Sequence, residues 1–415
     1  MNNRMTARIG LAVLLATSIP AIPAIPAIAA DPGRVDAGSG GFSLSSADEA
    51  WELRLRGLLH VDGRYFGDDS APDNDNEWLL RRVRLQMEGS FGERIEFRLM
   101  PDFGNGDTQI VDAYVDTKLG GGVTLRAGKY KPPVGLERQQ SASSLRMVER
   151  SIVSDLLPNR DIGLQLSGGE RLSWAVGIFN GVDDGRSGDQ DDDGNQEFAA
   201  RLFAEPLKSD DSVLGIGLGA TFGSTEGNAL VPLLNTYRSP GQNAIFLYRV
   251  GLDGTFADGE RLRLAPQFYW YNGPLGLLGE WARVRQDVRR VGADFDRSET
   301  LDHEAWQLTA EWFLTGDKAA FRDPRSAAGA VQLVARVSQL TIDDAAFVGG
   351  DSSFANPTLA ASSADTWGVG VNWYPIEGLK GSLIYQQTSF EGGGALTGGD
   401  RRDEKALFVR LQHGF

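Results

Sequence analysis

Residues 405–415 read K-A-L-F-V-R-L-Q-H-G-F, an alternating segment that ends on an aromatic residue. Counting back from Phe415 by twos places Leu407, Val409, Leu411 and His413 on one face. Arg410 and Gln412 fall on the other face, so one side suits lipid and the other suits water. A soluble edge strand can alternate in the same way, but the pattern is typical of the last strand of an outer-membrane β-barrel.

The first 30 residues have the features of a secretory signal peptide. Arg4 and Arg8 precede an apolar run, and the small residues Ala29 and Ala30 provide a cleavage site. A transmembrane helix is the competing interpretation, but prolines at positions 20, 23 and 26 would break it. No Cys follows for a lipid anchor. Beyond Ala30 no apolar stretch approaches the roughly 20 residues that a membrane helix needs, so a chain that spans a membrane would do so as a barrel.

Alternating segments recur from Trp51 onward and predict an all-β fold, a transmembrane antiparallel β-barrel over residues 51–415. An even number of strands is typical of bacterial barrels. Residues 31–50 are rich in Gly, Ser and Asp and predict a short periplasmic lead without a strand. The sixteen expected strands are 51–66, 79–91, 94–103, 109–119, 123–130, 161–167, 172–179, 197–205, 213–222, 244–256, 261–271, 304–314, 330–342, 366–374, 379–390 and 405–415.

The connections between these segments are alternately short and long. Tight turns are expected at 92–93, 120–122, 168–170 and 258–259, and they would face the periplasm. Long polar loops are expected at 67–77, 182–196, 272–303 and 343–365 on the outside. The acidic run 189–193 has spacing that occurs in calcium sites, although a solvated acidic loop is the favoured interpretation.

The residue types that most enzymes and cofactors need are scarce. The chain has no Cys, and its three His residues, at positions 60, 303 and 413, lack metal-ligand spacing. No G-x-S-x-G or G-x-x-x-x-G-K element occurs. We therefore expect a channel with no cofactor, no bound metal and no nucleic-acid partner, and an outer-membrane enzyme is a remote alternative.

The net charge of −15 hides an expected excess of inward cations. The strand phase that places aliphatic residues outward places many arginines inward, and these are expected to line the lumen: Arg54, Arg56, Arg84, Arg98, Arg249, Arg263, Arg336 and Arg410. Inward acids are also expected, so cross-strand pairing on the wall is the alternative: Asp62, Glu88, Glu96, Asp112, Asp116 and Asp253. Guanidinium groups stay charged and bind oxyanions in a planar fork, which favours an anion path.

The long connection after the strand 123–130 differs from the other loops. It contains K-P-P-V-G-L-E-R at 131–138, followed by Ser143, Ser144 and the apolar residues Leu136, Leu145 and Val148. Apolar residues in a loop favour burial, so this third loop is expected to fold into the lumen and narrow the pore.

The chain here resembles the phosphate-selective porins O and P of the Gram-negative outer membrane. The resemblance rests on Arg81-Arg82, the G-K-Y-K-P-P-V-G-L-E element at 128–137, Ser143-Ser144, Glu149-Arg150 and N-W-Y at 372–374. It implies a sixteen-stranded barrel, a homotrimer, and a phosphate-binding constriction at the third loop. The residues implied in that site are Arg138, Ser143 and Ser144, completed by Arg81 or Arg82 with Arg126. The family has Lys at the position of Arg138, and two additional residues here separate Arg138 from the Ser pair.

The predicted function is passive diffusion of small anions, either inorganic phosphate or polyphosphate, across the outer membrane of a Gram-negative bacterium. Lipid and the barrel-assembly machinery, through Phe415, are the other expected partners. A pore for sugars or organic anions is the alternative, with Tyr130, Trp270 and Tyr271 as candidate contacts, although the outward Trp residues fit interfacial girdles better. A salt bridge from Arg138 to Glu137 or Glu149 would merely pin the loop. If Arg138 instead binds anions, Arg138→Glu reduces anion preference.

Overall fold

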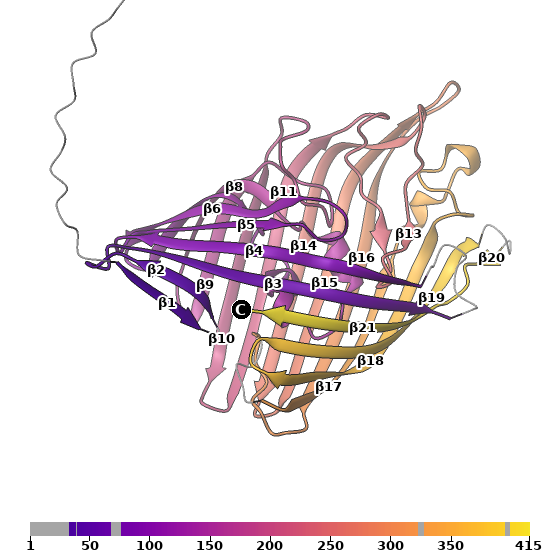
Figure 1. The fold of residues 1–415 in the computed structure, drawn as a ribbon. Coiled ribbons are helices and arrows are strands. Elements are labelled where there is room, and N and C mark those ends of the chain that lie inside the picture. The colour runs from indigo at the N-terminus through magenta and orange to yellow at the C-terminus, as the bar shows by residue number, and fades with distance from the viewer. Residues whose placement is uncertain (1–32, 39, 68–75, 323–327, 395–398) are drawn as a thin grey trace, which may run out of the picture.

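The computed structural model describes residues 33–38, 40–67, 76–322, 328–394 and 399–415. The expected signal peptide, residues 1–30, lies outside the described residues. The fold is a closed antiparallel barrel of sixteen strands, as predicted (Figure 1). Among the described residues, helices are short and none is long and apolar enough to cross a membrane.

The barrel strands follow one another in chain order around the wall, and each pairs with the strands before and after it. They are β3 (Trp51–Phe66), β4 (Glu77–Phe91), β5 (Ile95–Asp102), β6 (Gln109–Gly120), β7 (Val123–Tyr130), β8 (Asp161–Gly168), β9 (Leu172–Phe179), β10 (Glu197–Lys208), β11 (Ser212–Glu226), β14 (Thr255–Asn272), β15 (Leu275–Val291), β16 (Asp296–Phe313), β17 (Ala330–Thr341), β18 (Ala361–Ile376), β19 (Leu379–Gly394) and β21 (Glu404–Gly414). A short strand, β20 (Gly399–Asp400), pairs with the end of β19.

The carboxyl-terminal strand closes the barrel against the first strand (Figure 1). The register runs from Gly414↔Leu58 to Ala406↔Phe66, and β19 occupies the other edge of β21. Leu411 is 53% exposed on the outer face, whereas Arg410 is buried on the inner face. The predicted alternation of this strand is therefore confirmed.

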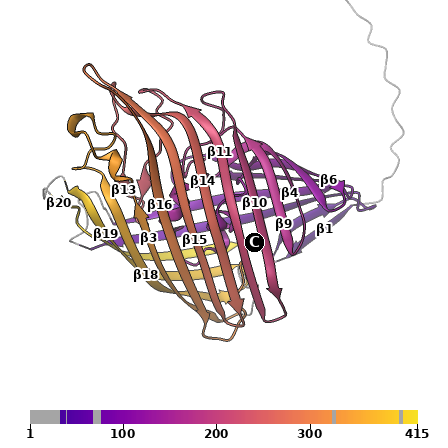
Figure 2. The same cartoon turned by 180° about the vertical axis from the view of Figure 1, so that it is seen from behind.

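The predicted number of sixteen strands is correct, but one barrel strand is missing from the prediction and one predicted strand is not part of the barrel. The predicted loop 272–303 contains β15 and part of β16, joined to β14 by a tight turn at Gly273-Pro274. In the second half of β15 the outward residues include Arg283, Arg285 and Arg289. These charged residues interrupt the alternation of apolar and polar residues by which strands are recognised in the sequence. Figure 2 shows β14, β15 and β16 as long neighbouring strands in the wall.

The predicted strand 244–256 is mostly absent. Within it, Ala244–Phe246 forms β13, which pairs with β12 (Tyr237–Arg238) in a separate two-stranded sheet, and the last two residues already belong to β14. Ile245 and Phe246 are buried in a core that also contains residues of barrel strands, which explains an apolar pattern outside the wall. The predicted turn at 258–259 lies within β14, where the register shifts between Ala257 and Arg261.

The lead before the barrel forms a hairpin that the sequence did not indicate. It consists of β1 (Arg34–Gly38) and β2 (Gly41–Ser45), and β2 pairs with β3 through Phe42↔Leu55. Strand β21 contacts β3 only from Leu58 onward, so the residues of β3 before Leu58 would have an open edge. The hairpin covers that edge, and an open edge otherwise invites pairing with other chains.

The core of this protein lies inside the barrel and is made largely by connections. The third loop, defined here as residues 131–160, contains α1 (Leu136–Gln139) and the 3-10 helices η1 (Ala142–Ser144) and η2 (Ile152–Leu156). Its Val134, Val153 and Leu156 are fully buried. The expectation that this loop folds into the lumen is confirmed by its contacts with inward residues of the far wall, described below.

Gly219 on β11 provides the space for the start of the third loop. A Cβ at this position would lie 2.3 Å from the carbonyl oxygen of Val134 and 2.7 Å from its Cα. The same carbonyl accepts a 2.7 Å hydrogen bond from Gln267 Nε2. The loop backbone therefore lies directly against β11, and only Gly permits that approach.

We predict that Gly219→Ala displaces the third loop and lowers the free energy of unfolding by about 1 to 3 kcal/mol, the usual cost of overpacking. Denaturant titration of the refolded, lipid-reconstituted protein measures this change, and single-channel conductance reports the loop. Gly381→Ala is the matched control, because a Cβ there meets nothing within 4 Å. Equal stabilities for the two variants would contradict the prediction.

Candidate anion-binding site in the barrel lumen

Side chains from the far wall hold the third loop across the lumen. Glu311 on β16 forms a 2.7 Å ion pair with Arg146, and Arg336 on β17 pairs with Glu137. Lys380 on β19 donates to the carbonyl oxygens of Ser143 and Leu145 at 2.9 and 3.0 Å. Further hydrogen bonds to loop carbonyls come from Asn372 on β18 and Gln412 on β21. Each of five consecutive wall strands, β16 to β19 and β21, thus contributes at least one contact.

The start of α1 is fixed by a carboxylate on β15. Glu280 accepts hydrogen bonds from the backbone N–H groups of Leu136, at 2.5 Å, and Glu137, at 3.2 Å. These N–H groups have no partner within a helix of four residues, so an inward carboxylate supplies the acceptor that they need. This contact joins residues 144 positions apart in the sequence.

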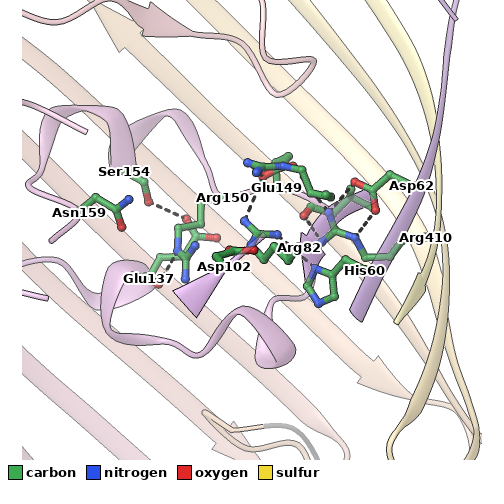
Figure 3. A network of polar contacts seen from close by, with 12 residues as sticks. His60, Asp62, Arg82, Asp102, Glu137, Glu149, Arg150, Ser154, Asn159 and Arg410 are labelled. Carbon is green, nitrogen blue, oxygen red and sulfur yellow. Dashed lines mark hydrogen bonds and ion pairs between the residues drawn. The ribbon is translucent and has the colours of Figure 1, made fainter. Parts of the chain in front are cut away.

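The other end of the loop is held at Glu149, which lies among four arginines (Figure 3). Arg81 forms the closest pair, with Nε at 2.6 Å from Oε1, and Arg64 Nη2 lies 3.1 Å from the same oxygen. Arg82 and Arg410 each lie 3.6 Å away. Burial raises the pKa of the Glu149 carboxyl, but the arginines outweigh it and hold that pKa well below its usual range.

A β-bulge directs both members of the Arg81-Arg82 pair into the lumen. His60 on β3 pairs with Arg82 and the next residue, Val61, pairs with Leu80, so Arg81 has no partner across the ladder. Neighbouring residues in a regular strand point to opposite faces, and the extra residue of a bulge cancels this alternation. Both arginines consequently reach Glu149.

A cavity of about 840 Å³ lies between the third loop and the wall formed by β3 to β7, with further lining from the ends of β18, β19 and β21. Eight cationic side chains line it, against three carboxylates, although the whole chain carries −15. The cations are Arg56, Arg84, Arg98, Arg126, Lys131, Arg160, Arg322 and Lys380, and the carboxylates are Glu88, Asp112 and Glu377. The local charge of this cavity is therefore opposite in sign to that of the protein.

Ion pairs on the wall neutralise part of this charge. Arg84 contacts Asp102 at 2.7 Å, Arg160 contacts Asp112 at 2.8 Å, and Arg126 pairs with Asp116 through two 2.7 Å hydrogen bonds. Arg98 pairs with Glu88. Cross-strand pairing, the alternative to a freely cationic lumen, thus accounts for several of these arginines.

Lys131 and Arg150 of the third loop, like Arg138 described below, have carbonyl partners instead of carboxylates. Lys131 Nζ donates to the carbonyl oxygen of Gln140 at 2.7 Å, and Arg150 donates to the carbonyl oxygens of Glu137 and Gln140 at 3.1 and 2.9 Å. Within the described residues neither forms an ion pair. Burial, followed by the charges of Arg150 and Arg160, holds the pKa of Lys131 well below its usual range. Burial and Arg138 lower the pKa of Arg150 to about 9.

The structure separates the six residues expected to form one anion site. Ser143, Ser144 and Arg126 line the cavity. Arg81 and Arg82 face Glu149 instead. Arg138 lies away from the cavity, where its Nε donates to the carbonyl oxygen of Ser154 at 2.9 Å. This pins the loop, as the alternative interpretation held, but through a carbonyl and not through Glu137 or Glu149.

Seven of the eight arginines expected to face inward do so. Arg54, Arg56, Arg84, Arg98, Arg263, Arg336 and Arg410 lie at inward positions of β3, β4, β5, β14, β17 and β21. Arg249 is the exception, because its segment is a connection and not a strand. Its guanidinium contacts Ser353 Oγ and the carbonyl oxygen of Gly350, which belong to another loop.

The acidic run 189–193 makes local contacts. Asp191 Oδ1 accepts the N–H groups of Asp193 and Gly194 at 3.1 and 2.6 Å, and Asp189 pairs with Lys129. No group of three or more carboxylates and histidines arranged for a metal ion occurs in the part of the chain that the structure describes. His303 is buried beside Tyr248, whose hydroxyl lies 2.8 Å from its Nε2.

Comparison with known proteins supports this architecture over nearly the whole barrel. The family model described as phosphate-selective porin O and P matches residues 53–415. The chain belongs to this family. It is therefore an outer-membrane β-barrel porin. No curated protein matches the sequence.

Solved porin structures share the fold at low sequence identity. The outer-membrane channel DcaP of Acinetobacter baumannii has a TM-score of 0.59 and 12% identity, covering 91% of this porin and 100% of that chain. An anion-selective porin from Comamonas acidovorans has a TM-score of 0.54 and 13% identity over 88% and 100% of the two chains. OmpT of Vibrio cholerae in its trimer form has 0.51 and 8% over 88% and 100%.

A buried carboxylate makes the seating of the third loop sensitive to pH. Asp155 in η2 accepts a 2.7 Å hydrogen bond from the backbone N–H of Arg238 in the connection between β11 and β14. Burial raises the pKa of Asp155 to about 6, against the opposing charge of Arg138. The folded protein therefore binds this proton more tightly than the unfolded chain, so its stability increases as the pH falls through 6.

We predict that Asp155→Asn, which keeps the acceptor but not the charge, is more stable than the unmodified porin at pH 7.5 by up to about 3 kcal/mol. The difference is expected to vanish near pH 4, where Asp155 is protonated. Urea unfolding at several pH values measures it. A difference that stays constant from pH 7.5 to pH 4 would show that the Asp155 charge is not its cause.

Proposed function

We propose that this porin conducts small anions through the cationic cavity and retains phosphate or polyphosphate beside Lys131. The observation that carries the proposal is the excess of cations over carboxylates along the cavity, in a chain whose total charge is negative. A narrow passage bounded by low-dielectric walls strengthens the field of such charges and raises the local concentration of anions. Membership in the phosphate-selective family supports the same ligand class.

The donors at this place suit a tetrahedral oxyanion. Lys131 has one carbonyl partner and retains two further N–H donors. Arg160 and Arg84 lie near it, as their effect on its pKa indicates, and the Ser143 hydroxyl lines the same cavity. Charge-assisted donors favour phosphate, while the carboxylates paired with Arg84 and Arg160 moderate the affinity and permit release.

A sugar pore is less well supported by the aromatic residues. Tyr114 and Tyr130 line the cavity, but the Arg126 guanidinium lies 3.9 Å from the Tyr114 ring centre and 5.3 Å from that of Tyr130. The rings thus stack on a cation and not on open space. Tyr271 is buried and does not line the cavity, and Trp270 lies in the outward phase of β14.

The oligomeric state follows from strand length in this proposal. Strands β5, β7, β8 and β9 have 8 residues each. A tilted strand needs about 9 to 11 residues to cross the bilayer. We infer that this low side of the wall, including Leu164, contacts other subunits in a homotrimer.

We also propose export through the signal peptide and recognition of Phe415 by the barrel-assembly machinery.

We predict that Lys131→Gln raises the phosphate concentration that half-blocks chloride current by about tenfold, which corresponds to about 1.4 kcal/mol. The reversal potential in a KCl gradient is expected to shift toward that of a less anion-selective pore. Planar-bilayer recordings measure both quantities. Lys208→Gln is the control, since Lys208 pairs with Glu205 at the end of β10, away from the cavity. A Lys131→Gln channel indistinguishable from this control would refute the site.

We predict that Leu164→Gln converts the trimer to monomers, because a polar side chain is then buried between subunits. Leu383→Gln on β19 is the matched control, since both leucines are 52% exposed on the outer face. Native mass spectrometry in detergent gives the distribution. Trimers that persist in Leu164→Gln would place the interface elsewhere on the wall.

A further inference from the structure

The positive charge of the arginines around Glu149 exceeds the negative charge of its carboxylate. Four guanidinium groups lie within 3.6 Å of its two oxygens, and they come from β3, β4 and β21. Asp62 is the other buried acid, with two hydrogen bonds to Arg410 at 2.6 and 2.7 Å. Glu77 approaches Arg64 only at 3.6 Å, with a side chain that is 48% exposed. Two buried carboxylates therefore face four buried or half-buried arginines.

Unused donors accompany this excess of charge. Arg82 Nη1 lies 3.2 Å from His60 Nδ1, and since Arg only donates, the proton of the neutral His60 ring is on Nε2. That Nε2 is buried and has no hydrogen-bond partner in the described structure, and the same holds for Arg64 Nε. His60 itself is fully buried. Buried donors without acceptors are rare, and an additional bound acceptor is one explanation for them.

We propose that Arg64, Arg81, Arg82 and Arg410 form a second anion site, for a tetrahedral oxyanion, and that the Glu149 carboxylate occupies it as a tethered anion. This site is separate from the one at Lys131 and does not rest on the proposed function.

Charge and shape both favour a tetrahedral oxyanion over the tethered carboxylate. A carboxylate brings one charge and two oxygens, whereas a phosphate dianion brings two charges and four oxygens. Planar guanidinium forks from three strands match the latter better. Free phosphate and Glu149 are consequently competitors for the same donors.

The remaining contacts of the third loop allow the site to be emptied without losing the loop. Arg146 with Glu311, Arg336 with Glu137, and Glu280 with the start of α1 all lie on other parts of the wall. Glu149→Ala thus removes the tethered anion and leaves the four arginines in a lumen that is otherwise held. Glu149→Gln keeps the shape and removes only the charge.

The test is thermal unfolding of the refolded, full-length porin with inorganic phosphate titrated against chloride at constant ionic strength. Glu149→Ala is expected to show a saturable rise in Tm of several degrees with phosphate, beyond any rise in the unmodified porin. Glu149→Gln is expected to gain a smaller rise. Glu311→Ala is the control, because it removes a wall carboxylate that also holds the third loop but that pairs, among the described residues, with one arginine, Arg146, instead of four.

The outcomes separate this proposal from its alternatives. A phosphate response of both Glu149 variants no larger than that of Glu311→Ala would overturn it. If Glu149→Ala refolds only when phosphate is present, the proposal is supported, whereas failure of both Glu149 variants to refold in either buffer shows a purely structural carboxylate and overturns it. A Lys131→Gln, Glu149→Ala double variant that retains the Tm response while losing current block distinguishes this site from the one at Lys131.

Discussion

Every other feature of this porin depends on the closure of β21 against β3. A bilayer offers no hydrogen-bond partner to the backbone, so the wall is stable in lipid only when its first and last strands pair. Closure makes the two faces of each strand unequal, because one faces lipid and the other faces the lumen. The total charge of −15 therefore says little about the interior, where arginines at inward positions coexist with acids that pair with some of them and not with others.

The interior is filled by ordering a loop with buried ion pairs. Taking charges out of water is costly, and such pairs contribute more to a unique arrangement than to net stability. Here they connect the third loop to β16 and β17 through Glu311 and Arg336, and to β3, β4 and β21 through the loop's own Glu149. Glu280 on β15 adds hydrogen bonds to the loop backbone. Because these contacts engage the loop's carboxylates, Lys131, Arg138 and Arg150 are left with carbonyl oxygens, and of these three Lys131 lines the cavity.

The sequence was most informative where the backbone has a period. Alternation located fifteen of the barrel strands and the inward phase of their arginines, and it failed at β15, where outward residues turn charged above the membrane, and at 244–256, where apolar residues pack inside the lumen. The third loop has no period. Its composition predicted burial, and Ser143 reached the cavity as expected, but the direction of Arg138 depends on Ser154 and that of α1 on a strand 144 residues away. Lys131 and Arg150 lie in the quoted motifs, but the motifs do not show that these two cations form no ion pair, since that depends on where the fold places the carboxylates.

Because of the bulge in β4, the presence or absence of one residue in this strand changes the positive charge of the lumen. The pairs His60↔Arg82 and Val61↔Leu80 flank a single unpaired residue, so a chain one residue shorter at Arg81 would have a regular ladder with the same partners on both sides. Insertion or loss of one codon at this point changes the number of arginines that reach Glu149 without altering any other strand pair. A variant of this chain that lacks Arg81 would therefore have one positive charge fewer in the lumen while the strand pairs of β3 and β4 stay the same.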